Sequence, residues 1–280
     1  MAKVFSNAIK KTALQYGCIV SVCYLFFYYY HTLLSQQPGY IISLNYDITS
    51  LVLISCGGVK FVFSYAYLPL VFDFLFLFFP LLLTATILYN WQHKNTVIIA
   101  TVVFTAYYSI INCSVTYFSL EGYVALTAVP FLFWGNPTSF YYNKQMVRYV
   151  FLLLFVGAGV FKIINGGISN YAQLSAILAT QHASYMLYND NWLTNYYQYL
   201  IHKEWLTYTL YILSILLELC FVVGFFTTKY DRYLVYLFLF FLVSDYAFMH
   251  INYIFWLPFI LTLFWSKGNS PYKLVATLKV

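Results

Sequence analysis

Charged side chains are scarce in this sequence. The 280 residues include 14 Lys and Arg and 8 Asp and Glu, which together make up 8% of the chain. Soluble domains carry roughly 25% charged residues, so this composition excludes a soluble globular protein. The net charge of +6 is spread thinly along the chain and forms no basic patch, so no nucleic-acid partner is expected.

Cysteine is also sparse, and its five copies form no C-x-x-C pair. They lie mostly within apolar runs, which is typical of buried structural thiols. Neither a disulfide framework nor a metal cluster is therefore expected. The five residues are Cys18, Cys23, Cys56, Cys113 and Cys220.

Motifs of the common enzyme classes are missing as well. The chain has no phosphate-binding glycine loop, no H-E-x-x-H and no G-x-S-x-G. No two histidines are spaced i, i+4, which argues against haem or copper ligation within a helical bundle. There is no internal repeat and no shift in composition, so we expect a single domain over residues 1–280.

Long apolar runs dominate instead, with 62% hydrophobic residues and a mean hydropathy of +0.74. A helix needs roughly 17–25 mostly apolar residues to cross a bilayer, and several runs reach that length. The sequence therefore predicts an all-α, polytopic membrane bundle of about eight spans. The predicted spans are 14–34, 61–89, 96–118, 124–142, 147–165, 206–227, 232–248 and 251–266.

Two segments near the N-terminus could be misread. The first apolar run follows a short basic start, as a signal peptide does, but it is long, aromatic and without a small-residue cleavage site, so we expect an uncleaved span. Residues 40–57 are interrupted by Asn45 and Asp47 and are expected to lie along the surface or re-enter. A ninth span there would invert everything downstream.

The basic residues indicate the orientation. With the N-terminus inside, all of the 14 basic residues except Lys60, Lys162 and Lys203 fall on the cytoplasmic side. This pattern predicts an N-in, C-in protein with short cytoplasmic tails at 1–13 and 267–280. We expect it in a bacterial inner membrane or an organelle membrane.

The longest stretch between spans, about residues 165–205, then lies on the outer side. It is rich in Tyr, Trp, Asn and Gln, and carries Trp192 and Trp205. Such a segment is expected to form one or two amphipathic helices anchored by interfacial aromatics and capping the bundle beside Lys162. Long structured loops are often functional lids, although anchoring alone would explain these residues.

Lys162 is the most informative residue because a cation within an apolar run is costly and usually has a role. Glu218 and Asp245 are other ionisable residues within predicted spans, and each should face the bundle interior and pair. One interpretation is a structural ion pair, for example between Lys162 and Glu218. The other is a desolvated Lys162 beside a cavity, acting as a base or nucleophile.

Two further ionisable residues have open roles. Asp73, in the second span, has Lys60 and Lys162 as candidate partners. His250, near the outer turn between the last two spans, is either a proton carrier or a solvated histidine.

A family resemblance rests on these residues. Gly157–Ile164, the polar segment after it, Leu216–Phe226 and Asp231-Arg232 resemble the membrane core of the vitamin K-dependent γ-glutamyl carboxylase. That core is the HTTM (horizontally transferred transmembrane) domain, a relative of the DoxX-like proteins. The similarity covers about residues 14–268.

The resemblance places Lys162 on the lysine proposed to start quinol oxygenation, as a candidate base with Glu218 as its counter-charge. It implies a quinone or lipid in an outward-facing cavity near Lys162, and no metal. The residues expected to bind this ligand are Asn112, Cys113, Asp245 and His250.

The chain departs from the family at several points. Asn112–Ser114 lacks the family's histidine, Asn165–Asn170 lacks its acidic residue and tryptophan, and Val243–Asp245 replaces its Phe-His. No large lumenal portion follows the last span, so carboxylation of a peptide is not expected. The alternative is a non-catalytic accessory or structural subunit of a membrane complex.

Overall fold

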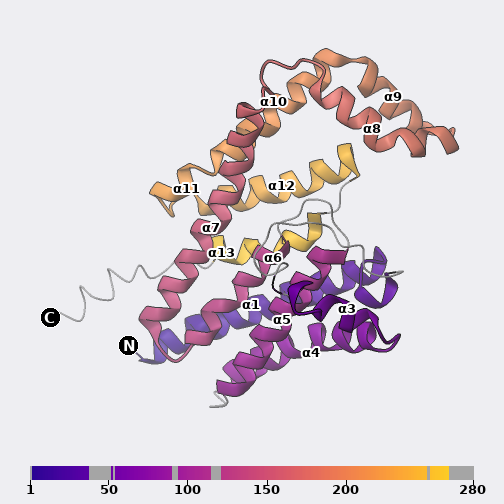
Figure 1. Cartoon of the computed structure of the whole chain (residues 1–280). Helices are drawn as coiled ribbons and strands as arrows, with labels where there is room; N and C mark the ends of the chain where they lie inside the picture. The colour runs from indigo at the N-terminus through magenta and orange to yellow at the C-terminus, as the bar shows by residue number, and fades with distance from the viewer. Residues whose placement is uncertain are drawn as a thin grey trace. The chain divides into compact units, whose positions relative to one another are not determined.

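The computed structural model describes residues 2–37, 52, 54–89, 94–114, 121–250 and 253–264. Every regular element among them is a helix, which confirms the all-α prediction (Figure 1). The chain divides into two compact units, and the division falls inside one long helix. Unit 1 contains residues up to Arg148 and from Ile254 onward, and unit 2 contains Tyr149–Tyr253.

Unit 1 is built around aromatic side chains. Helix α1 packs on α4, α4 on α5, and α5 on the 3₁₀ segment η2. Phe76 stacks on Tyr107 with ring centroids 4.1 Å apart, and Phe27 lies 4.3 Å from Phe255. The elements are α1 (Ala2–Tyr29), η1 (Leu34–Gln36), α3 (Gly58–Phe63), α4 (Leu68–Leu88), α5 (Lys94–Ser114), α6 (Glu121–Val124), η2 (Ala125–Phe133), α7 (Pro137–Ile164, shared with unit 2), η3 (Tyr253–Phe259) and α13 (Ile260–Phe264).

Asp73 has a structural role in this unit. Its carboxylate accepts hydrogen bonds from the backbone N–H groups of Leu34 and Ser35, at 3.0 and 2.9 Å, and from the Tyr107 hydroxyl. Backbone amides at the start of η1 are thus its partners, in place of the lysine suggested by the sequence. A buried carboxylate is well stabilised by two or three such donors.

Five helices among the described residues are long and apolar enough to cross a membrane, which fits a multi-pass integral membrane protein. They overlap five of the predicted spans, although the helices at Leu68–Leu88 and Thr138–Ile164 start well away from the predicted positions 61 and 147. Two further predicted spans correspond to shorter apolar helices at Asn95–Ile111 and Tyr253–Leu263. The five long segments are Ile9–Gln36, Leu68–Leu88, Thr138–Ile164, Glu204–Phe226 and Asp231–Met249.

The region 124–142 differs from its prediction. It is not one α-helix, because η2 ends at Phe133 and α7 begins at Pro137. The Asn136 side chain accepts a hydrogen bond from the backbone N–H of Ser139, and proline suits the first helical turn, so a new helix starts there. Helix α7 then runs without interruption through 143–146, where the sequence predicted a turn between two spans, and that boundary is wrong.

Unit 2 consists of the rest of α7 and five further helices. Helices α8 and α9 form a hairpin that packs on α10 (Figure 1). Its buried core contains Leu174, Leu178, Leu200, Tyr211 and Ile215. Residues 165–205 were predicted to form one or two amphipathic helices, and the segment does contain two helices. Apolar and polar side chains separate onto opposite faces in α9 but not in α8, so the amphipathic part of the prediction is wrong for α8. The elements are α8 (Gln173–Tyr188), α9 (Trp192–His202), α10 (Glu204–Cys220), α11 (Val223–Phe226) and α12 (Asp231–Met249).

Of the segment 40–57, only residues 52 and 54–57 are described. The prediction that it lies on the surface or re-enters therefore falls mostly outside the described residues. The C-terminal tail at 267–280 lies outside them as well.

Candidate functional site

The C-terminus of α7 places Lys162 in unit 2. The chain leaves the helix through Gly166, whose φ of +77° is a conformation that glycine adopts without strain. The N–H of Gly167 bonds the carbonyl of Lys162 at 2.9 Å, and that of Gly166 bonds the carbonyl of Ile163 at 3.0 Å. This pair of bonds is the Schellman motif, which ends the helix and satisfies two of its last carbonyls.

Lys162 forms the ion pair that the sequence suggested. Its Nζ lies 2.7 Å from Oε1 of Glu218 on α10. The two side chains differ in exposure, with 29% of Lys162 and only 4% of Glu218 accessible. The ammonium also lies 5.8 Å from the ring centroid of Tyr211, within the range of a cation–π contact.

Two glycines make this close approach possible. A Cβ on Gly159 would lie 3.2 Å from Cβ of Glu218, so only glycine lets α10 come this near to α7 without adjustment. A Cβ on Gly167 would lie 2.8 Å from the Tyr211 ring. Small residues at helix contacts serve this purpose in membrane bundles.

Asp245 on α12 joins this group through its charge. It is half-buried and interacts electrostatically with both Lys162 and Glu218. The second oxygen of Glu218, Oε2, is buried and has no hydrogen-bond partner among the described residues. Two predicted site residues, Lys162 and Glu218, are thus in direct contact, and Asp245 interacts with them through its charge.

The contact between Lys162 and Glu218 bears on whether Lys162 can act as a general base. A carboxylate at hydrogen-bond distance stabilises an ammonium, whereas a general base must hold a free lone pair at its reacting atom. The contact with Glu218 therefore favours Lys162 as a counter-ion.

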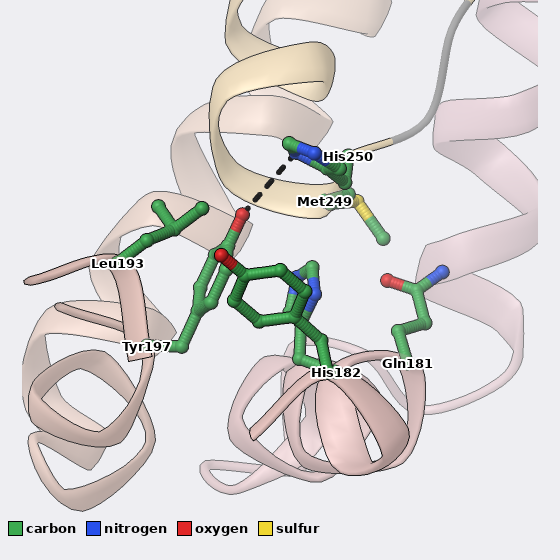
Figure 2. Close-up of a pocket in the computed structure, with 7 residues that line it drawn as sticks. Gln181, His182, Leu193, Tyr197, Met249 and His250 are labelled. Atoms are coloured by element: carbon green, nitrogen blue, oxygen red, sulfur yellow. Dashed lines mark hydrogen bonds between the residues drawn. The ribbon is translucent and has the colours of Figure 1, made fainter. Parts of the chain in front are cut away.

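A pocket of about 270 Å³ lies elsewhere in unit 2, between the α8–α9 hairpin and the end of α12 (Figure 2). Lys162 is not among its lining residues, whereas the predicted ligand-binding residue His250 is. The lining residues are Gln181, His182, Tyr185, Leu193, Tyr197, Met249 and His250.

Three rings connect the walls of this pocket. His182 is buried and stacks on Tyr197 with centroids 3.7 Å apart and planes at 12°. Its Nε2 lies 3.2 Å from the carbonyl oxygen of Phe248, which can only accept, so Nε2 carries a proton. The Tyr197 hydroxyl lies 3.4 Å from Nδ1 of His250, as Figure 2 shows.

The pKa of His182 lies below its ordinary value of 6.5. Burial is the main cause, because it penalises the charged imidazolium, and the neighbouring His250 adds to it. The hydrogen bond to Phe248 acts in the opposite direction. The His182 side chain is therefore neutral near pH 7.

The remaining predicted ligand-binding residues were Asn112 and Cys113. They lie at the end of α5 in unit 1, and their side chains are outside the described part of the structure. Among the described residues, no group of three or more His, Cys, Asp and Glu is arranged to hold a metal ion.

Sequence reasoning missed His182 and Tyr197. The signal was a histidine and tyrosines within a polar segment, but which of them meet depends on how α8 and α9 pack against each other. The comparisons with known proteins add nothing to this geometry, since no family model, curated protein or solved structure matches the chain.

Proposed function

We propose that the chain is a multi-pass membrane protein that binds the headgroup of a quinone or lipid in the pocket lined by His182, Tyr197 and His250. The observation that carries this proposal is the pocket itself, which combines a few polar side chains with apolar walls. Concave sites with a few convergent polar groups are the usual places where small ligands bind.

The polar groups suit a ligand with carbonyl or hydroxyl oxygens. If the Tyr197 hydroxyl donates to Nδ1 of His250, then Nε2 of His250 carries a proton and can donate to a ligand. The amide of Gln181 can both donate and accept. Leu193 and Met249 supply apolar contact for a ring.

The proposed topology is N-in, C-in with eight membrane segments, which places the α8–α9 hairpin on the outer side. Segment η2 has 9 residues, so at a 3₁₀ rise of about 2.0 Å per residue it extends about 18 Å, less than the roughly 30 Å hydrocarbon core. Segment η2 therefore spans the hydrocarbon core only together with the residues that precede it in the chain. The support for this orientation is the distribution of Lys and Arg.

Kinship with the HTTM domain is part of the proposal and is supported by Gly157–Ile164 and Leu216–Phe226. Within it we assign Lys162 as the counter-ion of Glu218, because the 2.7 Å contact fits that role better than that of a base.

A thermal-shift titration tests ligand binding. The protein in lipid nanodiscs is titrated with a short-chain benzoquinone, and separately with a short-chain phospholipid. We expect one of them to raise the melting temperature saturably.

Tyr197→Phe should weaken the affinity about 5- to 10-fold, the equivalent of one lost hydrogen bond. The matched control His202→Gln changes an exposed histidine of α9 and should leave the affinity unchanged. No saturable shift, or an equal loss in both variants, would overturn the proposal.

Cysteine labelling tests the orientation. The native cysteines are first replaced, and a single cysteine is then introduced at either Asn189 or Thr228. Both positions are exposed and lie between helices. A membrane-impermeant maleimide added to intact cells should label position 189 only. Labelling of position 228 instead would reverse the topology.

A non-catalytic accessory subunit is the second candidate, and the ion pair favours it. In that case Lys162→Met would lower stability without changing quinone or lipid affinity, and the purified protein would bind neither probe.

A further inference from the structure

The aromatic rings that line the pocket between the α8–α9 hairpin and the end of α12 cross at steep angles. Tyr185 and Tyr197 have ring centroids 6.3 Å apart and planes at 90°. His182 and His250 also lie 6.3 Å apart, with planes at 75°. All four residues line the pocket. Rings that cross in this way form corners, and a rounded group fits a corner better than a flat group does.

The parallel ring pairs, in contrast, leave no slot for a flat ligand. His182 lies 3.7 Å from Tyr197 with planes at 12°, and His250 lies 5.2 Å from Tyr246 with planes at 15°. A flat ring inserted between two others would need them about 7 Å apart, which is twice the contact distance of roughly 3.5 Å. Both stacks are tighter than that. Of the two ligand classes in the proposed function, the lipid headgroup therefore fits this geometry better than the planar quinone.

The seven residues that line the pocket include no lysine, arginine, aspartate or glutamate. An anionic headgroup would bring a phosphate with no permanent cation to compensate it, and the desolvation of an unpaired charge is costly. A zwitterionic headgroup carries both charges itself. The composition of the pocket wall therefore favours a zwitterion over an anion.

Both parts of a zwitterion have partners in this pocket. Tyr185 is half-buried and keeps accessible surface, whereas Tyr197 is buried. The Tyr185 hydroxyl accepts a 2.9 Å hydrogen bond from the side-chain amide of Asn191, which restricts the ring. Quaternary ammonium groups are attracted to the faces of such rings and bind in aromatic cages. The N–H groups of Gln181 and His250 can donate to phosphate oxygens.

We propose that the pocket binds a phosphocholine group, with its trimethylammonium against the ring of Tyr185 and its phosphate toward Gln181 and His250. This inference rests on the proposed function, because it names the ligand class of the same pocket. The group is shared by phosphatidylcholine lipids and by soluble glycerophosphocholine, which carry the same quaternary ammonium and phosphodiester. Tyr185 is then the residue that selects for the quaternary ammonium.

A thermal-shift titration in dodecyl maltoside micelles tests the ligand class, because this detergent contains neither ammonium nor phosphate. The probes are dihexanoyl phosphatidylcholine, glycerophosphocholine, dihexanoyl phosphatidylglycerol and an isostere of the first lipid in which carbon replaces the ammonium nitrogen. The isostere keeps the shape of the headgroup and removes its positive charge.

We expect phosphatidylcholine to bind at least about 10-fold more tightly than phosphatidylglycerol. It should bind about 5- to 10-fold more tightly than the isostere, as the loss of a cation–π contact predicts. Saturation by glycerophosphocholine as well would show that the headgroup is sufficient, and saturation by the lipid alone would show that the acyl chains contribute. Either result supports the proposal.

Variants of Tyr185 test its role in selection. Tyr185→Leu removes the ring and should abolish the preference for phosphatidylcholine over the isostere, whereas Tyr185→Phe keeps the ring and should retain the preference. The matched control Tyr188→Leu makes the same change on the same helix, at a tyrosine that is 82% exposed and does not line the pocket. It should leave the preference unchanged. The ratio of two affinities is measured on one folded variant, so a loss of stability alone does not alter it.

Equal affinities of the wild-type protein for phosphatidylcholine and its isostere would overturn the proposal, as would a preference that survives Tyr185→Leu. Saturable binding of a short-chain benzoquinone in the same micelles, without binding of phosphatidylcholine, would overturn this inference and leave the proposed function standing. The absence of a saturable shift with every probe would overturn both.

Discussion

The hydroxyl of Tyr107 on α5 donates a 2.6 Å hydrogen bond to Oδ1 of Asp73 on α4, and both side chains are buried. The same carboxylate also holds the backbone amides of Leu34 and Ser35. One acid of α4 thus fixes both the neighbouring helix and the turn that follows α1.

Removal of this carboxylate should therefore cost more than removal of the hydroxyl. Tyr107→Phe deletes one hydrogen bond and should lower the free energy of unfolding by about 1 kcal/mol. Asp73→Ala leaves the buried Leu34 amide and the buried Tyr107 hydroxyl without an acceptor, together with the part-buried Ser35 amide, and should cost about 2–4 kcal/mol. Denaturation of the purified protein in mixed detergent micelles measures both. The control Asp190→Asn, at an exposed position between helices, should change the free energy of unfolding by less than about 0.5 kcal/mol. Equal effects for Asp73→Ala and Tyr107→Phe would contradict this account.

Gly157 and Gly159 provide a matched pair on α7. A Cβ on Gly157 meets nothing within 4 Å, whereas one on Gly159 lies 3.2 Å from Cβ of Glu218 and 3.3 Å from Leu219. Gly157→Ala should be neutral or stabilise by up to about 1 kcal/mol, because alanine favours the helix. Gly159→Ala should destabilise by about 1–3 kcal/mol, because the helices must move apart. The same denaturation assay separates them, and identical results for the two variants would show that α7 and α10 do not pack this closely.

The sequence predicted the parts of this fold that depend on local composition. Apolar runs of sufficient length identified the helices at Leu68–Leu88, Glu204–Phe226 and Asp231–Met249. The ion pair of Lys162 with Glu218 followed from the cost of a charge at membrane depth. Burial of a charge restricts its partners so strongly that few choices remain.

Features that depend on tertiary contacts were not predictable in this way. Composition does not distinguish the 3₁₀ segment η2 from an α-helix. The hydropathy pattern also did not show that a single helix, α7, covers the residues on both sides of Lys144. The partners of Asp73 are backbone amides, which carry no sequence signal. The contact between His182 and Tyr197 requires the hairpin to fold first.

The pKa of His182 makes the α8–α9 hairpin sensitive to acid. In the unfolded chain this histidine titrates near 6.5, and burial lowers the value in the folded protein. Its contribution to stability is therefore fully present above about pH 6.5 and is lost as the pH falls through the lower folded value. The melting temperature should decrease from about pH 7.5 to about pH 5.5, and His182→Phe, which keeps the ring stacking on Tyr197, should reduce this decrease. His202→Gln, on the exposed side of α9, should retain the full decrease. An unchanged pH dependence in His182→Phe would assign the effect to other groups.

Lys162 and Glu218 should respond unequally to substitution, because they are unequally buried. Lys162→Met leaves a carboxylate that is only 4% exposed without its cation, and should cost about 3 kcal/mol, the lower end of the roughly 3–5 kcal/mol for a broken buried pair. Glu218→Gln leaves an ammonium that is 29% exposed and can reach a polar environment, so its cost should be about 1 kcal/mol.

The double variant Lys162→Met, Glu218→Gln completes the cycle. It should be at least about 1 kcal/mol more stable than Lys162→Met alone, because no unpaired charge remains. Equilibrium unfolding of the four proteins in the same micelles gives the coupling free energy. Equal single-variant costs that simply add would mean that the 2.7 Å contact contributes nothing to stability, and Lys162 would then be available for another role.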